Sequence, residues 1–124
     1  MTLRLLAVDM PPLIRELIAR ALLRDAHEGV FVDLPASGGD IGALARAARA
    51  NAVVAPLIAG AWPSYCADLA RGVGPPLFGL DCDDGRGRIS ELRRVETRCE
   101  DLGVDGLTID ELIAKAACAG GVAA

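Results

Sequence analysis

The sequence predicts a single α/β domain with a mostly parallel sheet flanked by helices, and two observations carry that prediction. Short, nearly continuous apolar runs recur along the 124 residues, as in strands that are buried on both faces. Segments with helical periodicity or helix-capping residues separate these runs, and strands that alternate with helices over short loops form parallel sheets. A chain of this length forms one domain of ordinary size, so residues 1–124 are expected to fold as a single unit.

The first strand is expected at residues 3–8, which form an almost unbroken apolar run. Pro11 and Pro12 follow directly, and proline is tolerated in the first turn of a helix because its missing N–H is not needed there. Apolar residues then recur at three- and four-residue steps up to Leu22, which predicts a helix that lays one stripe on the sheet. Gly29 is expected to follow the end of this helix.

A second strand is expected at residues 30–34 and a third at 52–58, since both segments are apolar. Loop-forming residues (PASGGD) follow the second strand. The spacing of Ser37 and Asp40 predicts a capping box there, which would start a helix that continues through Arg49.

The second half of the chain begins with a short helix, expected at residues 64–71. A fourth apolar strand is expected at residues 77–82. Near the C-terminus, Thr108 and Glu111 have the spacing of another capping box, and the apolar residues after them form one face of a final helix.

The segment after the fourth strand has two interpretations. A parallel crossover needs about a dozen residues, and fewer separate the fourth strand from the next strand candidate. That candidate would therefore return antiparallel, through a hairpin with Asp84 and Gly85 in its turn, and we expect such an edge hairpin near residues 77–95. The alternative is a helix over residues 89–102, where apolar side chains step by three and four.

Composition excludes several classes of function. Seventeen acidic residues against thirteen basic ones give a net charge of −4, which argues against nucleic acid as a partner. No apolar stretch approaches the length of about 20 residues that a membrane span needs, and no export signal is visible. The four cysteines lack a C-x-x-C spacing and His27 is the only histidine, so neither a metal nor another cofactor is expected. We expect free thiols and a cytoplasmic protein.

The segment LLAVDMPPLIRELIARAL, residues 5–22, and the order of the elements resemble the receiver (response-regulator) family, which has a flavodoxin-like fold. The resemblance covers roughly residues 3–80. In that family two acids after the first strand hold Mg²⁺, and an aspartate after the third strand accepts a phosphoryl group. A Ser or Thr after the fourth strand and a Lys after the fifth then bind the phosphate.

Compared position by position, only the first acid of that pocket is present. Asp9 matches the first member of the acidic pair, and Met10 stands where the second would be. Pro56 stands at the phosphoacceptor position, and proline has neither a nucleophile nor a charge. Asp81 or Leu80 replaces the hydroxyl residue. The resemblance therefore implies a degenerate receiver that holds Mg²⁺ poorly, is not an enzyme, and acts in bacterial-type signalling by binding another protein.

Two groups of residues are candidate contacts for that partner. Trp62 and Tyr65 follow the third strand, and such aromatics are typical anchors of interfaces, although they fill cores more often. The second group is a cluster of arginines that would suit an acidic partner or an anion, or would simply form a solvated edge: Arg86, Arg88, Arg93, Arg94 and Arg98.

Two further hypotheses follow from the sequence. The alternative function is a small α/β enzyme or ligand-binding protein that uses the crevice at the carboxyl ends of the strands, near Asp9, Ser37 and Asp81. Self-association as a homodimer through the C-terminal half is also expected, because the mean hydropathy is +0.37. The last helix carries the run LIAKAACA, which offers little polar cover, and symmetric dimers commonly bury such a face.

Overall fold

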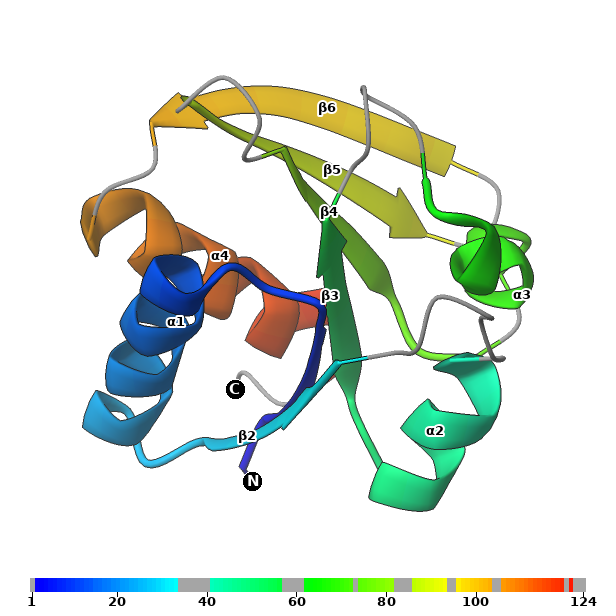
Figure 1. Cartoon of the computed structure of the whole chain (residues 1–124), viewed down its shortest axis with the longest axis horizontal. Coiled ribbons are helices and arrows are strands. Elements are labelled where there is room, and N and C mark those ends of the chain that lie inside the picture. The colour runs from blue at the N-terminus through cyan, green and yellow to red at the C-terminus, as the bar shows by residue number, and fades with distance from the viewer. Residues whose placement is uncertain are drawn as a thin grey trace.

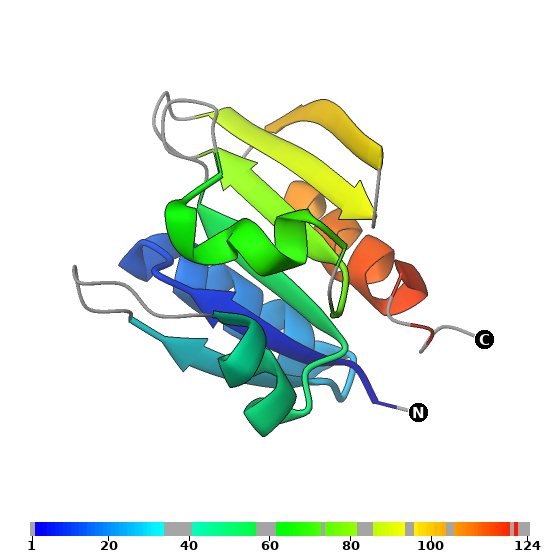
Figure 2. The same ribbon diagram turned by 90° about the vertical axis from the view of Figure 1, so that its right-hand side faces the viewer.

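The computed structural model describes residues 2–33, 41–56, 62–72, 74–81, 86–93, 96–103, 106–119 and 121. One sheet runs through the molecule in the order β2-β1-β3-β4-β5-β6, with helices on both of its faces (Figure 1, Figure 2). Four neighbouring strands of this sheet are parallel: β1 (Arg4–Val8), β2 (Glu28–Val32), β3 (Ala52–Pro56) and β4 (Leu77–Asp81). The predicted α/β class with a parallel sheet is therefore confirmed.

The helices divide into two layers (Figure 1). Helices α1 (Pro12–Arg24) and α4 (Gly106–Ala119) cover one face of the sheet and contact each other. The opposite face carries α2 (Ile41–Ala48), the 3-10 turn η1 (Ser64–Cys66) and α3 (Ala67–Ala70). The first and last helices of the chain thus lie side by side.

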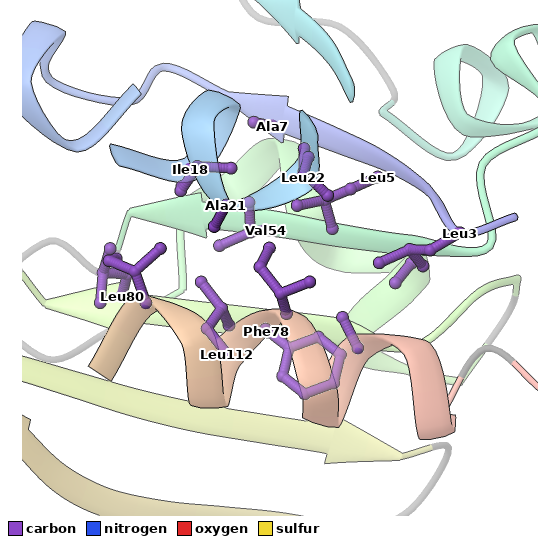
Figure 3. Close-up of a cluster of buried hydrophobic side chains, with 14 of the residues drawn as sticks. Leu3, Leu5, Ala7, Ile18, Ala21, Leu22, Val54, Phe78, Leu80 and Leu112 are labelled. Carbon is purple, nitrogen blue, oxygen red and sulfur yellow. The ribbon is translucent and has the colours of Figure 1, made fainter. Parts of the chain in front are cut away.

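The core consists of two apolar clusters, one on each face of the sheet. Because successive residues of a strand point to opposite faces, Leu5 and Ala7 enter the cluster under α1 and α4, whereas Leu6 and Val8 enter the cluster under α2 and η1. Figure 3 shows the first cluster, where Phe78 is the largest fully buried side chain among the described residues. Both faces of the parallel strands are therefore covered, which explains their continuous apolar sequences.

Beyond β4 the sheet continues with two more strands. Strand β5 (Arg86–Arg93) pairs antiparallel with β4, and β6 (Glu96–Gly103) pairs antiparallel with β5. The described part of residues 89–102, for which a helix was the alternative, lies in these two strands. The turn expected at Asp84 and Gly85 lies outside the described residues, so the hairpin that would join β4 to β5 stays a prediction.

Helix α1 ends in a backbone motif without glycine. Ala26 has a positive φ of 58°. The N–H of His27 donates to the carbonyl oxygen of Leu22 at 2.8 Å, and the N–H of Ala26 donates to that of Leu23 at 3.1 Å. These two bonds form a Schellman motif, which normally places glycine at the left-handed position. The motif stops α1 early, so β2 begins at residue 28 instead of the predicted 30.

Gly29 lies inside β2 rather than before it. A Cβ atom at this position would approach the side chains of Leu22 and Phe31 to 2.8 Å. Glycine therefore lets α1 pack closely on the edge strand.

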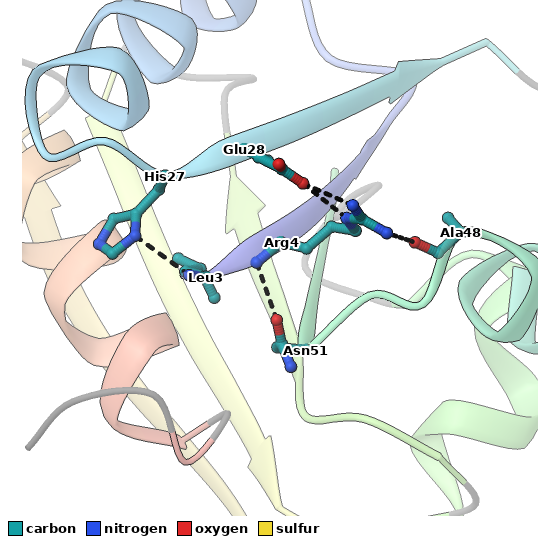
Figure 4. A network of polar contacts seen from close by, with 6 residues as sticks. All are labelled: Leu3, Arg4, His27, Glu28, Ala48 and Asn51. Atoms are coloured by element: carbon teal, nitrogen blue, oxygen red, sulfur yellow. Dashed lines mark hydrogen bonds and ion pairs between the residues drawn. The ribbon is translucent and has the colours of Figure 1, made fainter. Parts of the chain in front are cut away.

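Polar contacts fix the amino end of β1 (Figure 4). The N–H of Leu3 donates to Nδ1 of His27 at 3.1 Å, and the N–H of Arg4 donates to Oδ1 of Asn51 at 2.8 Å. The guanidinium of Arg4 also forms an ion pair with Glu28 at 2.6 Å. His27 thus has a structural role, and the candidate site lies at the other end of the strands.

Candidate functional site

The carboxyl ends of the parallel strands meet at one edge of the sheet, where the sequence places the candidate pocket. Ala7 pairs with Val54 in the β1–β3 ladder, and continuing this parallel register places Asp9 opposite Pro56. Pro56 in turn pairs with Leu80 on β4. The structure therefore brings the predicted acid and the predicted phosphoacceptor position to neighbouring points of the same edge.

Asp9 adopts an unusual backbone conformation at this edge. Its φ is +51°, in the left-handed region that non-glycine residues rarely occupy, although aspartate tolerates it better than most. Its N–H donates to the carbonyl oxygen of Val32 at 2.9 Å. This bond ties the turn to the end of β2, so that the chain can leave β1 and enter α1 at Pro12.

Tyr65 comes from η1 and brings its hydroxyl to the Asp9 carboxylate. Burial of the hydroxyl raises the pKa of Tyr65 above its ordinary value of 10.0. The negative charge of Asp9 raises it further, as does that of Cys66 once its thiol ionises at high pH. A polar interaction with the Asp9 carboxylate contributes to the same shift. The hydroxyl is buried and makes no hydrogen bond of good geometry within the described part of the chain. Tyr65 is therefore a protonated phenol held beside a carboxylate.

Cys66 follows Tyr65 and is fully buried. Burial is the main reason why the pKa of its thiol rises from 9.0 to about 12, and the negative charge of Asp9 is the second reason. A thiol is nucleophilic only as the thiolate, so a thiol with this pKa is inert at neutral pH. Cys66 thus fills space behind the pocket and is not a catalytic candidate.

Met10 and Pro56 complete the pocket without adding polar ligands. Met10 is only 4% exposed and belongs to the apolar cluster under α1 and α4. Within the described ranges, no group of three or more His, Cys, Asp or Glu side chains could hold a metal ion. Mg²⁺ prefers several oxygen ligands, and the acidic side chain that the described register places opposite Pro56 is that of Asp9.

A groove lies next to this pocket, between α1 and β2. It has a volume of about 620 Å³. Its floor includes Met10 and Phe31, and its rim carries the ion pair between Arg15 and Asp33, whose atoms are 2.6 Å apart. The Nε atom of Arg15 is buried and has no hydrogen-bond partner among the described residues. The groove thus combines an apolar floor with the cationic side chain of Arg15.

The other candidates from the sequence do not converge on this pocket. Trp62 is half-buried and packs, with Tyr65, against the cluster under α2. Asp81 ends β4, where the register places it opposite Arg88 of β5. Two candidates, Ser37 and Arg94, lie outside the described residues. The remaining arginines of the cluster lie on β5 and β6: Arg86, Arg93 and Arg98.

Two features of the site carry no signal in the sequence. Tyr65 was singled out as a partner contact, and its position beside Asp9 follows only from the folding of η1 over the sheet edge. The ion pair of Arg15 with Asp33 was not anticipated either, since α1 and β2 meet only in the fold.

None of the helices in the portion of the chain that the structure describes is long and apolar enough to cross a membrane. Comparison of the chain with models of protein families, with curated proteins and with solved structures gives no match.

Proposed function

We propose that this protein is a receiver-like domain with a flavodoxin-like fold that has lost phosphorylation chemistry and regulates another protein by binding it in the cytoplasm. The order of the parallel strands, β2-β1-β3-β4, supports the fold, because flavodoxin-like sheets begin with the same order. The antiparallel pairing of β5 with β4 departs from that pattern, which has a fifth parallel strand.

One observation carries the functional proposal. The register places Pro56 opposite Asp9 at the carboxyl edge, where a receiver would hold its phosphoacceptor next to its acidic pair. Proline cannot accept a phosphoryl group, and the neighbouring Met10 is buried in the core. The layout of this edge resembles that of a receiver, but the reactive groups are replaced. This combination favours a protein that its partner recognises by shape and not by phosphorylation.

The groove between α1 and β2 supports binding as the activity. An apolar floor with a charged rim is the arrangement that protein and ligand contacts share. The Arg15–Asp33 pair at the rim offers both signs of charge to a partner segment.

The test is an amide NMR titration with Mg²⁺ and beryllium fluoride, an analogue of the phosphoryl group. We expect no shifts for the wild-type protein. We expect Pro56→Asp to bind Mg²⁺, with shifts around Asp9, because this substitution places a second carboxylate on the neighbouring strand. Ala43→Asp, at an exposed position of α2, is the matched control for an added charge.

Shifts around Asp9 in the wild-type protein would contradict the loss of phosphorylation chemistry. If Pro56→Asp folds but gives the same flat titration as Ala43→Asp, the edge does not have receiver geometry.

The groove also favours the alternative function, a small-ligand-binding protein. Because the cationic side chain of Arg15 lines the groove beside apolar residues, the ligand class would be an apolar carboxylate. An NMR titration with benzoate tests this alternative, which requires shifts at Phe31 that disappear in Arg15→Met. A titration without shifts at Phe31 would contradict it.

A further inference from the structure

Helix α1 carries two leucines that the packing of the domain leaves uncovered. Leu13 is 66% exposed and Leu23 is 79% exposed, and they are the large apolar side chains that stand out as exposed in the described part of the chain. Glu16 and Arg20 lie between them, with side chains 56% and 74% exposed. We call these four residues the α1 stripe.

The spacing of the α1 stripe is that of a helix–helix seam. Its residues follow one another at steps of three, four and three, the pattern of alternating a and d positions in a heptad. They lie on the side of α1 opposite the buried residues, which face the sheet and α4: Ile14, Ile18, Ala21 and Leu22. The stripe is therefore exposed to solvent, on a helix that lies at the outside of the molecule (Figure 1).

The α1 stripe is also complementary to itself when reversed. Its order is leucine, glutamate, arginine, leucine, with symmetric steps. In an antiparallel pair of α1 helices, Leu13 of one copy lies across from Leu23 of the other, and Glu16 lies across from Arg20. Every residue then meets a complementary one, which is the condition for an isologous two-fold contact.

We propose that a second copy of this chain docks on the α1 stripe, forming an antiparallel dimer about a two-fold axis. The leucines at both ends supply apolar contact. The four central charges alternate in sign across the axis, which fixes the register and disfavours a parallel pair. This inference does not depend on the receiver-like interpretation.

The charge pair of the stripe is already ordered in one chain. Arg20 and Glu16 form an ion pair at 2.6 Å within α1. The two side chains therefore lose less conformational freedom when a second copy arrives, which lowers the entropic cost of association. The ion pair of Arg24 with Asp110 of α4 further fixes the orientation of α1.

The structure offers less support for a dimer through the last helix. Four of the residues of α4 that motivate that prediction are buried in the cluster shared with α1: Leu112, Ile113, Ala116 and Ala117. On the outer side of α4, Glu111, Ala114 and Cys118 are exposed, and none of them is a large apolar residue. The uncovered apolar side chains belong to α1.

The contact is short and therefore weak. The stripe spans about 15 Å at 1.5 Å per residue, which places the dimer among small, transient interfaces. Sedimentation velocity should consequently be measured over a concentration series that reaches the high micromolar range.

Charge reversal tests the antiparallel register directly. Glu16→Arg makes both central positions positive, and Arg20→Glu makes both negative, so each variant alone repels its own copy. We expect each to weaken self-association about tenfold or more, since like charges that face each other are strongly unfavourable. An equimolar mixture of the two variants should recover the wild-type dimer fraction, because opposite charges then face each other at both positions.

Recovery of the dimer in the mixture also shows that both variants are folded, because only folded chains present the α1 stripe to each other. Arg46→Glu on α2 and Glu111→Arg on α4 are the matched controls, since both residues are exposed, and they should leave the dimer unchanged. A wild-type protein that stays monomeric throughout the series overturns the proposal. The proposal also fails if the single variants dimerise as the wild type does, or if the mixture does not recover the dimer. An equal loss of dimer in Glu111→Arg would overturn it as well.

Discussion

The phenol of Tyr65 lies beside the carboxylate of Asp9, with its hydroxyl shielded from water. This relationship joins η1 on one face of the sheet to the turn that leads from β1 into α1. A phenol in this position can donate a hydrogen bond to the carboxylate only while it is protonated. Asp9 therefore has an internal neighbour, Tyr65, at the carboxyl edge of the sheet.

The first prediction concerns stability at alkaline pH. Because the pKa values of Tyr65 and Cys66 are raised in the folded protein, both groups bind their proton more tightly there than in the unfolded chain. Their contribution to stability is complete below pH 9.0 and is lost as the pH rises from 9.0 toward about 12. We expect the free energy of unfolding, measured with urea, to fall over this range.

Tyr65→Phe and Cys66→Ala should each flatten that pH dependence. Tyr65 is the only tyrosine, so its ionisation can also be followed directly by ultraviolet absorbance. Its midpoint should lie above 10.0, and Asp9→Asn should lower it because the negative charge is removed. An unshifted midpoint in the wild-type protein would rule out the contact between Tyr65 and Asp9.

The second prediction separates the backbone of Asp9 from its side chain. With a φ of +51°, the position favours glycine over alanine by about 1 kcal/mol. Asp9→Ala should therefore destabilise the protein more than Asp9→Gly, by about that amount in chemical unfolding. Equal free energies of unfolding for the two variants would show that the left-handed conformation does not persist in solution.

The third prediction concerns the ends of α1 and α2. Ala26 and Arg49 occupy the left-handed position of a Schellman motif, with φ values of 58° and 55°. Ala26→Gly and Arg49→Gly should each stabilise the protein by about 0.5–1 kcal/mol, because glycine has no Cβ penalty there. Thermal melts of the single variants measure this gain.

Ala114→Gly is the matched control for these variants, since Ala114 is exposed in the interior of α4. Glycine in a helix interior should destabilise by about 1 kcal/mol. The idea fails if the substitutions at the helix ends lower the melting temperature as the control does.

The fourth prediction concerns the core under α4. Phe78 is fully buried between the sheet and the last helix. Phe78→Ala should lower the free energy of unfolding by about 3–5 kcal/mol, through lost burial and the cavity that remains. Phe78→Leu should retain most of the stability. A loss below about 1 kcal/mol for Phe78→Ala would mean that this cluster is not packed as described.

Much of the fold could be predicted from the sequence because its local signals agree with one another. The apolar runs gave β1, β3 and β4, and the proline-started amphipathic segment gave α1, within about two residues of their bounds. The start of β2 was placed too late, because a Schellman motif with Ala26 at its left-handed position leaves no glycine to mark the helix end. Backbone hydrogen bonds decided that boundary, and side-chain type did not reveal it.

The site could be predicted only where it follows from the ends of strands. Asp9 and Pro56 lie at such ends, so a parallel sheet brings them together. The contact of Tyr65 with Asp9 depends on how η1 packs on the sheet, and the ion pair of Arg15 with Asp33 depends on how α1 packs on it. No periodicity or spacing encodes contacts of that kind.

The contact between α4 and α1 has a consequence for how the chain is made. Helix α1 is synthesised before α4, yet Ile14, Ile18 and Leu22 share their cluster with residues of α4. Until α4 has been synthesised, that face of α1 has only part of its cover. Domains fold as units during synthesis, so this domain can close only after α4 has left the ribosome. A nascent chain stalled before residue 106 would expose an apolar surface to chaperones.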